Sequence, residues 1–206
     1  MKFLGQSNQD EFVIKLLNYK KNGYFLEIGS NHPININNTY VLEKEYNWNG
    51  LMVEYDKNFE SLYKQHRSSN YIIQDATKVN YEDLFKKYNF PNNMDYLQID
   101  LEVSNNSTLQ TLELLNDTIM KNYTFNVVTF EHDIYSGNYF NTRQRSREIF
   151  DNNNYIRVFS DVKNGGNPYE DWYVHSSFSN IELINKIKNE KSLEYIDVIQ
   201  ILNKNI

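Results

Sequence analysis

The stretch YFLEIGSNHP, residues 24–33, has the pattern of a strand that runs into a ligand-binding turn. The apolar run Tyr24–Ile28 has the length and composition of a buried strand. It ends at Gly29, and the polar residues 30–32 and Pro33 follow as a turn. A dinucleotide-binding fingerprint would place three glycines here, as G-x-G-x-x-G. This stretch has one, so we expect a ligand that does not need the other two.

The composition predicts one packed globular domain over residues 1–206. The chain is 40% hydrophobic and 15% aromatic, which suits a full-sized core. It has no cysteine, so disulfides and thiolate chemistry are excluded. The N-terminus turns polar after four residues, and no apolar run approaches the ~20 residues that span a membrane. We therefore expect no signal peptide, no membrane span and a cytoplasmic location.

The net charge of −6 argues against a nucleic-acid partner. Proteins that track phosphates usually carry a basic patch. The densest basic cluster is TRQRSR, with Arg143, Arg145 and Arg147 at alternate positions. On a helix these three are not expected to share one face, and both a solvated helix start and a phosphate site remain open.

Short β-rich runs alternate with segments of helical spacing along the chain. The expected strands are 24–28, 51–55, 71–74, 95–100, 125–131, 155–161 and 172–176. Helical patterns lie between the first five, which predicts βαβ units. The runs YLQI and NVVTF are apolar almost throughout, as in strands buried on both faces. The fold class is thus α/β, with a mostly parallel sheet and helices on both faces.

Both ends of the chain are expected to be helical. A first helix covers 10–19 within an N-terminal segment 1–20, and a C-terminal helix covers 180–203. In the C-terminal helix, Ile184, Ile187, Ile199 and Leu202 recur at helical intervals, which suits core packing or a homodimer face. The Gly/Pro-rich stretch KNGGNPYEDW, 163–172, is expected as a loop over a site. Trp48 is expected in the core.

Carboxylates stand at the ends of the first five strands. They include Glu27, Glu54, Asp75, Asp100 and Glu131. In open α/β sheets, ligands bind outside the carboxyl ends of the strands. Acids gathered on one rim repel each other and need cations, metals or ligand donors.

Some of the acids also have ordinary structural explanations. A single Asp after a strand often caps the next helix. For Asp75 that role and a ligand contact both remain open. Glu43 and Glu45 are expected as solvated helix residues.

Glu54 indicates an adenosine ligand without phosphates. It follows Gly29 by about 25 residues, where an acid accepts hydrogen bonds from ribose hydroxyls. Pyrophosphate needs glycines at a helix N-terminus, whereas this turn has one glycine and an acidic neighbour, Glu27. A cationic adenosine cofactor, S-adenosylmethionine (SAM), suits these residues. One glycine is enough to let its methionine part pass close to the backbone.

These residues resemble the FkbM-type family of SAM-dependent methyltransferases. The matching stretches are GQSNQDEF (5–12), GYFLEIGSNHP (23–33), NNTYVLEKEYNWNGLMVEYD (37–56), DYLQIDLE (95–102), VVTFEHD (127–133), SREIF (146–150), YIRV (155–158) and PYEDWYV (168–174). The resemblance implies a Rossmann-like class I methyltransferase fold, with a seven-stranded sheet whose last strand is antiparallel. It also implies O-methylation, commonly of sugar or polyketide-type hydroxyls. The chain departs from the family's D-x-E-G-x-E pattern at Val103 and Asn105, on the acceptor side.

The resemblance also implies the cofactor-binding positions, which are Gln6, Glu27, Gly29, Ser30, Glu54, Tyr55, Asp75, Ala76 and Asp100. Residues 27–30 would line the methionine and ribose, and Glu54 would hold the ribose hydroxyls. Tyr55 would lie against adenine, with residues 75 and 76 at its edge. Gln6 would close over the cofactor from the N-terminal segment, and Asp100 would face the sulfonium.

Methyl transfer to a sugar hydroxyl calls for a general base. The catalytic candidates are Asp100, His132, Glu131 and Glu102, and His132 is the most natural base at neutral pH. A divalent cation is a second way to activate a hydroxyl. Asp100, Glu102, Glu131 and Asp133 have the hard oxygen ligands that Mg²⁺ or Mn²⁺ prefers, so a metal is permitted without being required.

The expected function is therefore SAM-dependent O-methylation of a small-molecule or glycan acceptor through a hydroxyl group, most simply of a sugar. The aromatic residues Tyr169, Trp172 and Tyr173 could stack on a sugar ring or belong to the core. One alternative is a nucleotide-sugar glycosyltransferase that uses Asp100 and Glu102 as a metal–diphosphate clamp. Another is a non-catalytic binding subunit with a methyltransferase-like fold.

Overall fold

A seven-stranded sheet organises the chain in the computed structural model, which describes residues 2–178 and 180–206. Its strand order is β3-β2-β1-β4-β5-β7-β6. The bounds are β1 Tyr24–Ile28, β2 Asn49–Glu54, β3 Asn70–Ile73, β4 Asn93–Ile99, β5 Thr124–Glu131, β6 Tyr155–Asn164 and β7 Asn167–His175. Strand β7 is antiparallel to β5 and β6, and the other pairings are parallel. The predicted mostly parallel sheet with one antiparallel strand is confirmed.

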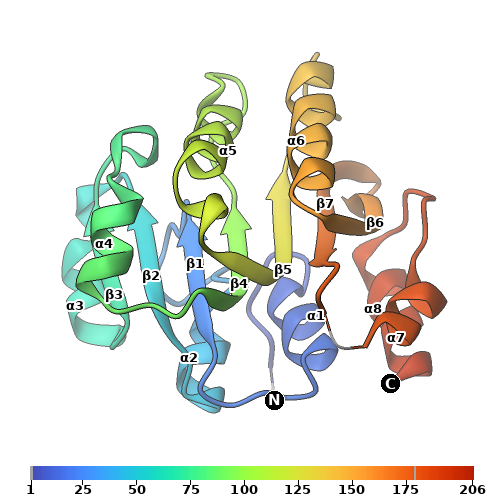
Figure 1. Ribbon diagram of the computed structural model, residues 1–206, viewed down its shortest axis with the longest axis horizontal. Helices are drawn as coiled ribbons and strands as arrows, with labels where there is room; N and C mark the ends of the chain where they lie inside the picture. Colours follow the sequence, from blue (N-terminus) through green and yellow to red (C-terminus); the bar gives the residue numbers. More distant parts are fainter. Residues whose placement is uncertain (1, 179) are drawn as a thin grey trace.

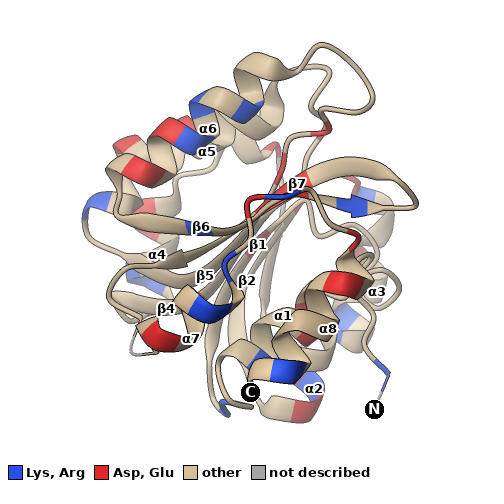
Figure 2. Ribbon diagram, turned by 90° about the vertical axis from the view of Figure 1, so that its right-hand side faces the viewer, with Lys and Arg blue, Asp and Glu red and all other residues tan. Residues whose placement is uncertain are grey.

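Helices cover both faces of this sheet (Figure 1). Their bounds are α1 Gln9–Leu16, α2 Tyr40–Tyr46, α3 Glu60–His66, α4 Tyr81–Lys87, α5 Ser107–Asp117, α6 Phe140–Asn152, α7 Ile181–Ile187 and α8 Tyr195–Asn205. Turned by 90°, the molecule shows α4, α5 and α6 on one side of the sheet, with α1, α2, α3 and α8 on the other (Figure 2). In the described residues, no helix combines the length and apolar character that crossing a membrane requires.

Each face of the sheet has its own hydrophobic core, because successive strand residues point to opposite sides. On the α1 side, Phe25 of β1 and Tyr96 of β4 share a cluster with Phe12. On the α5 side, Leu26 and Leu97 share a cluster with helix residues such as Leu112. This two-sided burial explains the continuous apolar runs. Trp48, 2% exposed, belongs to the core as predicted.

The stretch 163–172 is a hairpin rather than the expected loop. Strand β6 ends at Asn164 and β7 begins at Asn167. Gly165 and Gly166 connect them with φ of 60° and 87°, which a two-residue turn with positive φ at both positions requires. Tyr169, Trp172 and Tyr173 consequently lie inside the sheet and are at most 3% exposed. They are core residues, so the stacking role is wrong for them.

The C-terminal segment forms two helices instead of one. Between α7 and α8, the chain runs along the sheet edge, where the backbone N–H of Asn189 donates to Val158 O and that of Lys163 to Leu193 O. Ile184, Ile187, Ile199 and Leu202 are all buried in the α1-side core. Core packing therefore accounts for the apolar pattern, and these side chains are not available as a dimer face.

Candidate active site

The strand register aligns acids across three neighbouring strands. Ile28 pairs with Ile99, and Ile99 pairs with Phe130, so the next register step brings Gly29, Asp100 and Glu131 together. Glu131 itself pairs with Glu170 of β7. Their side chains point to the α1 face, the side on which Trp172, two residues after Glu170, packs against Phe12. A row of carboxyl groups therefore crosses β4, β5 and β7 near the carboxyl ends of the parallel strands.

A cavity of about 390 Å³ opens above this row. Six of the nine expected cofactor positions line it: Gln6, Glu27, Gly29, Ser30, Glu54 and Asp100. The acids Glu102, Glu131 and Asp133 line it as well. A second hollow of about 490 Å³ is lined by Tyr55, Asp75 and Ala76, the other three positions. Because Leu101 and Glu102 line both hollows, the two adjoin and place all nine positions around one continuous site.

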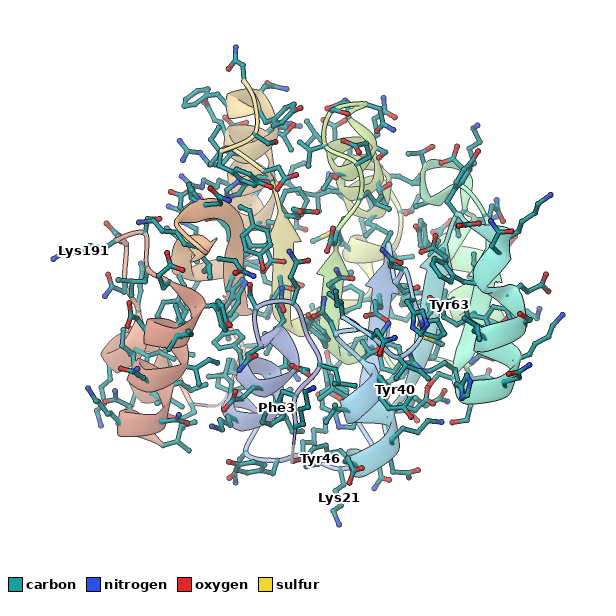
Figure 3. All side chains as sticks on the ribbon, turned by 180° about the vertical axis from the view of Figure 1, so that it is seen from behind. Phe3, Lys21, Tyr40, Tyr46, Tyr63 and Lys191 are labelled. Atoms are coloured by element: carbon teal, nitrogen blue, oxygen red, sulfur yellow. The ribbon has the colours of Figure 1, made fainter. Side chains whose placement is uncertain are left out.

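Gly29 is required by the close approach of β1 to β4. Its φ is +79°, and an added Cβ would lie 1.7 Å from the carbonyl oxygen of Asp100. After it, the hydroxyls of Ser30 and Tyr63 lie 2.7 Å apart, and Tyr63 donates to Asn31 O at 2.7 Å (Figure 3). Asn31 adopts φ of 49°. Tyr63 thus fixes the turn, and one glycine is what this backbone needs.

Glu54 is oriented by three backbone N–H groups at the lip of the cavity. Its Oε2 accepts from Asn31 N at 2.6 Å. Its Oε1 accepts from Tyr55 N at 2.9 Å and from Asp56 N at 2.7 Å. A carboxylate offers about four lone-pair sites. The position of Glu54 is therefore set by the backbone while it keeps capacity for a donor on a ligand.

Glu27 is a buried acid, 1% exposed, at the bottom of the cavity. Its oxygens accept from Thr39 Oγ1 at 2.7 Å, from Asn38 N at 3.0 Å and from Asn37 Nδ2 at 3.2 Å. Burial raises the pKa of Glu27 to about 7, although these bonds and the nearby Arg67 charge act in the other direction. A cation that reached this point would favour its ionised form.

Arg67 braces the loop that holds Glu27. The guanidinium donates to Asn37 Oδ1 at 3.0 Å and to Thr39 Oγ1 at 2.8 Å, and it lies over the ring of Tyr40 (Figure 3). It also pairs with Glu43 Oε2 at 3.1 Å. Glu43 is buried, 5% exposed, so its expected solvated position is wrong. Although burial acts to raise it, the Arg67 charge and several hydrogen bonds lower the pKa of Glu43 to about 2.

Asp100 and Glu131 form a carboxyl pair joined by a hydrogen bond. Such a bond requires one proton between the two groups. Burial and the adjacent Asp100 carboxylate raise the pKa of Glu131 far above its usual range. Burial also raises the pKa of Asp100. Since two neighbouring buried carboxylates cannot both ionise cheaply, the pair holds one proton at neutral pH.

Glu170 continues the row away from the cavity. It is 1% exposed and accepts from Trp172 Nε1 at 2.6 Å and from Gln9 Nε2 at 3.0 Å. Burial raises the pKa of Glu170 to about 8. In the described residues, no Lys, Arg or His side chain lies within ion-pair distance of Glu170 or of the Asp100–Glu131 pair.

His132 lies on the opposite face of the sheet from Glu131, because the two are adjacent in one extended segment. Its ring is fully buried and does not line the cavity. Nδ1 accepts from Ile134 N at 3.3 Å, and Nε2 is 3.4 Å from Asp161 Oδ1. The expectation that His132 is the base is therefore not supported by its position. Asp100 and Glu131, by contrast, both line the cavity.

The arginines of α6 neutralise the acids beside His132. Arg147 pairs with Asp171 at 2.6 Å and with Asp161 at 3.0 Å, and Arg143 pairs with Asp161 at 2.9 Å. Arg143 and Arg147 are one helical turn apart and share a face. Arg145 points elsewhere, to Glu113 and Glu148, so the prediction that the three arginines do not share one face is confirmed. These charges are used inside the protein and form no phosphate site.

The four predicted metal ligands line the same cavity, but they do not converge as a metal-binding group. Within the described parts of the chain, one group of residues has potential metal-ligand atoms within 4.8 Å of one another. It consists of His132, Asp161 and Asp171. The arginines of α6 already occupy its carboxylates, so it is an ion-pair network. The expected set of Asp100, Glu102, Glu131 and Asp133 forms no such group, and we assign it no metal.

Asp75 caps a short 3₁₀ turn, Ala76–Lys78, at the second hollow. Its Oδ1 accepts from Thr77 N at 3.0 Å and from Thr77 Oγ1 at 2.7 Å. Its Oδ2 is 3.0 Å from Lys78 Nζ. Tyr55 is 76% exposed across the same hollow. The hollow is thus open, with an aromatic ring on one side and a capped acid at its edge.

Two amide side chains in the cavity were missed by the sequence reasoning. Asn38 and Gln98 are 4% and 1% exposed, and both line the cavity. Among the described residues, Asn38 Oδ1 and Gln98 Oε1 have no hydrogen-bond partner. Buried polar atoms are normally paired, so these two acceptors indicate a ligand with donors. The available signal was the polar Gln98 inside the apolar strand DYLQID.

Two solved structures that are similar to this chain have TM-scores of 0.51 and 0.50, and both are named as methylases or methyltransferases. A candidate rRNA methylase from Clostridium thermocellum is 12% identical, with a TM-score of 0.51 over 84% of this chain and 99% of that chain. A methyltransferase from Pyrococcus furiosus is 13% identical, with a TM-score of 0.50 over 81% of each. No protein-family model matches the sequence, and no curated protein is significantly similar to it. The fold is therefore the Rossmann-like class I methyltransferase fold.

Proposed function

We propose that this protein is a SAM-dependent O-methyltransferase that acts on a hydroxyl group, most simply of a sugar in a glycan or polysaccharide. The observation that carries the proposal is the polarity of the cavity. Six carboxyl groups and two unpartnered amide oxygens line it, and in the described residues its lining includes no Lys, Arg or His. Such a cavity favours a cationic ligand over a phosphorylated one. The class I methyltransferase fold and the resemblance to FkbM-type enzymes support the same assignment.

The residues that line the two hollows suit each part of SAM. Glu27 and Asn38 Oδ1 would receive the ammonium group, and Glu54 would receive the ribose hydroxyls. The hollow between Tyr55 and Asp75 would take the adenine. When bound, SAM supplies a methyl group on a positively charged sulfur. Asp100, two residues after Gln98, is the acid that this positive charge would face.

The Asp100–Glu131 pair would accept the proton of the acceptor hydroxyl. The pair holds one proton, so one carboxylate remains available as a general base. The acceptor oxygen gains the methyl group and loses its proton to this carboxylate. The carbon–sulfur bond breaks, and its electron pair stays on sulfur. The rest of the cavity contributes by positioning, which is the main demand of an in-line transfer.

The glycosyltransferase alternative is disfavoured by the same charges. A nucleotide sugar brings a diphosphate, and the cavity lining offers it carboxylates without a gathered metal set. RNA, the acceptor class in the name of the Clostridium thermocellum protein, meets the same repulsion. The non-catalytic alternative gives no role to the acidic pair and the unpartnered amides that line the cavity.

Thermal unfolding with matched ligands tests the proposal. A ligand that binds only the folded state raises the midpoint. We expect SAM to raise it and NAD and UDP-glucose to leave it unchanged. SAM labelled in the methyl group should then transfer its label to oxygen of a sugar acceptor. A shift with UDP-glucose and none with SAM would overturn the proposal, and label recovered on nitrogen would contradict its O-methyl part.

A further inference from the structure

SAM does not neutralise all of the negative charge in the cavity lining. SAM carries an ammonium, a sulfonium and a carboxylate, for a net charge of +1. Even with Glu27 neutral and one proton on the Asp100–Glu131 pair, four negative charges remain in the lining, on Glu54, Glu102, Asp133 and one member of the pair. Hydrogen bonds from Ser104 lower the pKa of Glu102, which keeps it ionised. At least three negative charges in the lining therefore remain without a counterion.

In the part of the chain that the structure describes, no Lys, Arg or His side chain lines this cavity. Arg143 and Arg147 lie on the other face of the sheet and are paired with Asp161 and Asp171. Figure 2 shows acidic segments where the strands end in the middle of the molecule. The missing positive charge must therefore come from a ligand.

Gln98 gives an independent indication of a donor ligand. Its side chain is 1% exposed, lines the cavity, and lies two residues before Asp100 on β4. Among the described residues its Oε1 has no partner. An amide oxygen in this position is satisfied by an N–H or O–H group and repelled by a phosphate or carboxylate. It thus selects the same class of ligand as the acids do.

Asp133 marks the acceptor end of the cavity, which it lines together with Glu131. Its backbone is held by a bond from Asp133 N to Tyr169 O at 3.1 Å. Two carboxyl groups in the same part of the lining are a favourable setting for an organic cation.

We propose that the corner formed by Glu131 and Asp133 binds a protonated amine of the acceptor, so that the acceptor is an amino sugar whose amine is free. This inference rests on the proposed function. The ammonium lies at Asp133, and the hydroxyl to be methylated lies at Asp100. An N-acetylated sugar lacks the charge, and a phosphorylated sugar or an RNA brings the opposite one.

Binding of matched sugars to the full chain loaded with S-adenosylhomocysteine tests this. The probes are glucosamine, N-acetylglucosamine, glucose and glucose 6-phosphate, titrated by NMR at a pH that keeps the glucosamine amine protonated. We expect glucosamine to bind at least about tenfold more tightly than the other three. Asp133→Asn should remove this preference, and Asp117→Asn, which replaces an exposed acid at the end of α5, should keep it.

Equal binding of glucosamine and glucose, or no binding of glucosamine, would overturn the inference. Tighter binding of glucose 6-phosphate or of an RNA oligonucleotide would also overturn it. So would methylation of the amine, since the amine would then lie at Asp100. In the binding outcomes a protein that binds SAM still supports the proposed function, whereas methylation of the amine also contradicts its O-methyl part. Failure to bind either SAM or S-adenosylhomocysteine contradicts the proposed function instead.

Discussion

Asp100 and Glu131 lie on neighbouring parallel strands, at the carboxyl end of the sheet, and share one proton. Each is adjacent to an open cavity and remote from any cation in the described residues. Their relationship is set by the register of β4 and β5, and it determines what the cavity can bind and where a proton can go. The predictions below follow from this pair and from the residues that support it.

Asp100→Asn should remove the carboxylate of the pair that stays ionised and slow methyl transfer, because burial and the adjacent carboxylate keep the proton on Glu131. A general base typically contributes 10²- to 10⁴-fold, and we expect a loss of roughly this size. SAM affinity should fall by much less, because Glu54 and Glu27 are untouched. The measurement is the transfer rate at saturating SAM, with His132→Gln as the comparison. If the His132 variant loses transfer with SAM binding and folding intact, and the Asp100 variant does not, the assignment of the base is wrong.

Gly29→Ala should destabilise the protein severely. The new Cβ would meet Asp100 O at 1.7 Å, in a backbone conformation that L-residues rarely adopt. We expect a loss of more than about 3 kcal/mol in the free energy of unfolding. Gly166→Ala is the matched control, because its φ is also positive but nothing lies within 4 Å. It should cost about 1 kcal/mol. Equal losses for the two variants in urea unfolding would show that the contact with Asp100 is unimportant.

Arg67→Met should leave Glu43 buried without its partner. Breaking a buried ion pair on one side typically costs about 3–5 kcal/mol. It also removes the donors to Asn37 and Thr39, so the loop that holds Glu27 should loosen and SAM affinity should fall. The double variant Arg67→Met with Glu43→Leu should recover much of the stability but not the affinity. Recovery of both would mean that the guanidinium has no role in shaping the cavity.

The free protein should lose stability as the pH rises from about 5 to about 8. Glu27 and Glu170 have folded-state pKa values of about 7 and about 8, above the ordinary 4.5. A raised pKa contributes stability that is fully present below the unfolded value and is lost as the pH passes the folded value. For each of the two groups, the loss in the free energy of unfolding is on the order of 3 kcal/mol.

Chemical unfolding across this pH range measures the effect. Glu27→Gln should flatten the profile near pH 7, and bound SAM should stabilise more at high pH, where Glu27 is ionised. A profile that rises with pH between 5 and 8 in the wild-type chain would contradict the buried position of these acids.

The strands and their acidic ends could be predicted from the sequence, because both are local patterns. The run Tyr24–Ile28 and its single glycine indicate a strand, a turn and a ligand without phosphates. The side of the sheet that His132 faces could not be predicted, because a shift of one residue along a strand reverses it.

Side-chain contacts between residues far apart in the sequence could not be predicted either. Glu43 looked solvated because its partner Arg67 lies 24 residues away in the sequence. The stretch 163–172 looked like a loop because two glycines and a proline outweighed the β-rich residues after them. The unpartnered oxygens of Asn38 and Gln98 are visible only once the packing around them is known.

Calorimetric titration of SAM into the free protein is the decisive experiment for the cofactor site. We expect one SAM per chain, with binding weakened at least about tenfold by Glu54→Gln and unchanged by Glu45→Gln, which replaces an exposed acid on α2. NAD and UDP-glucose should give no heat of binding. The absence of SAM binding to the wild-type protein, or equal binding by both variants, would contradict the proposed cofactor site.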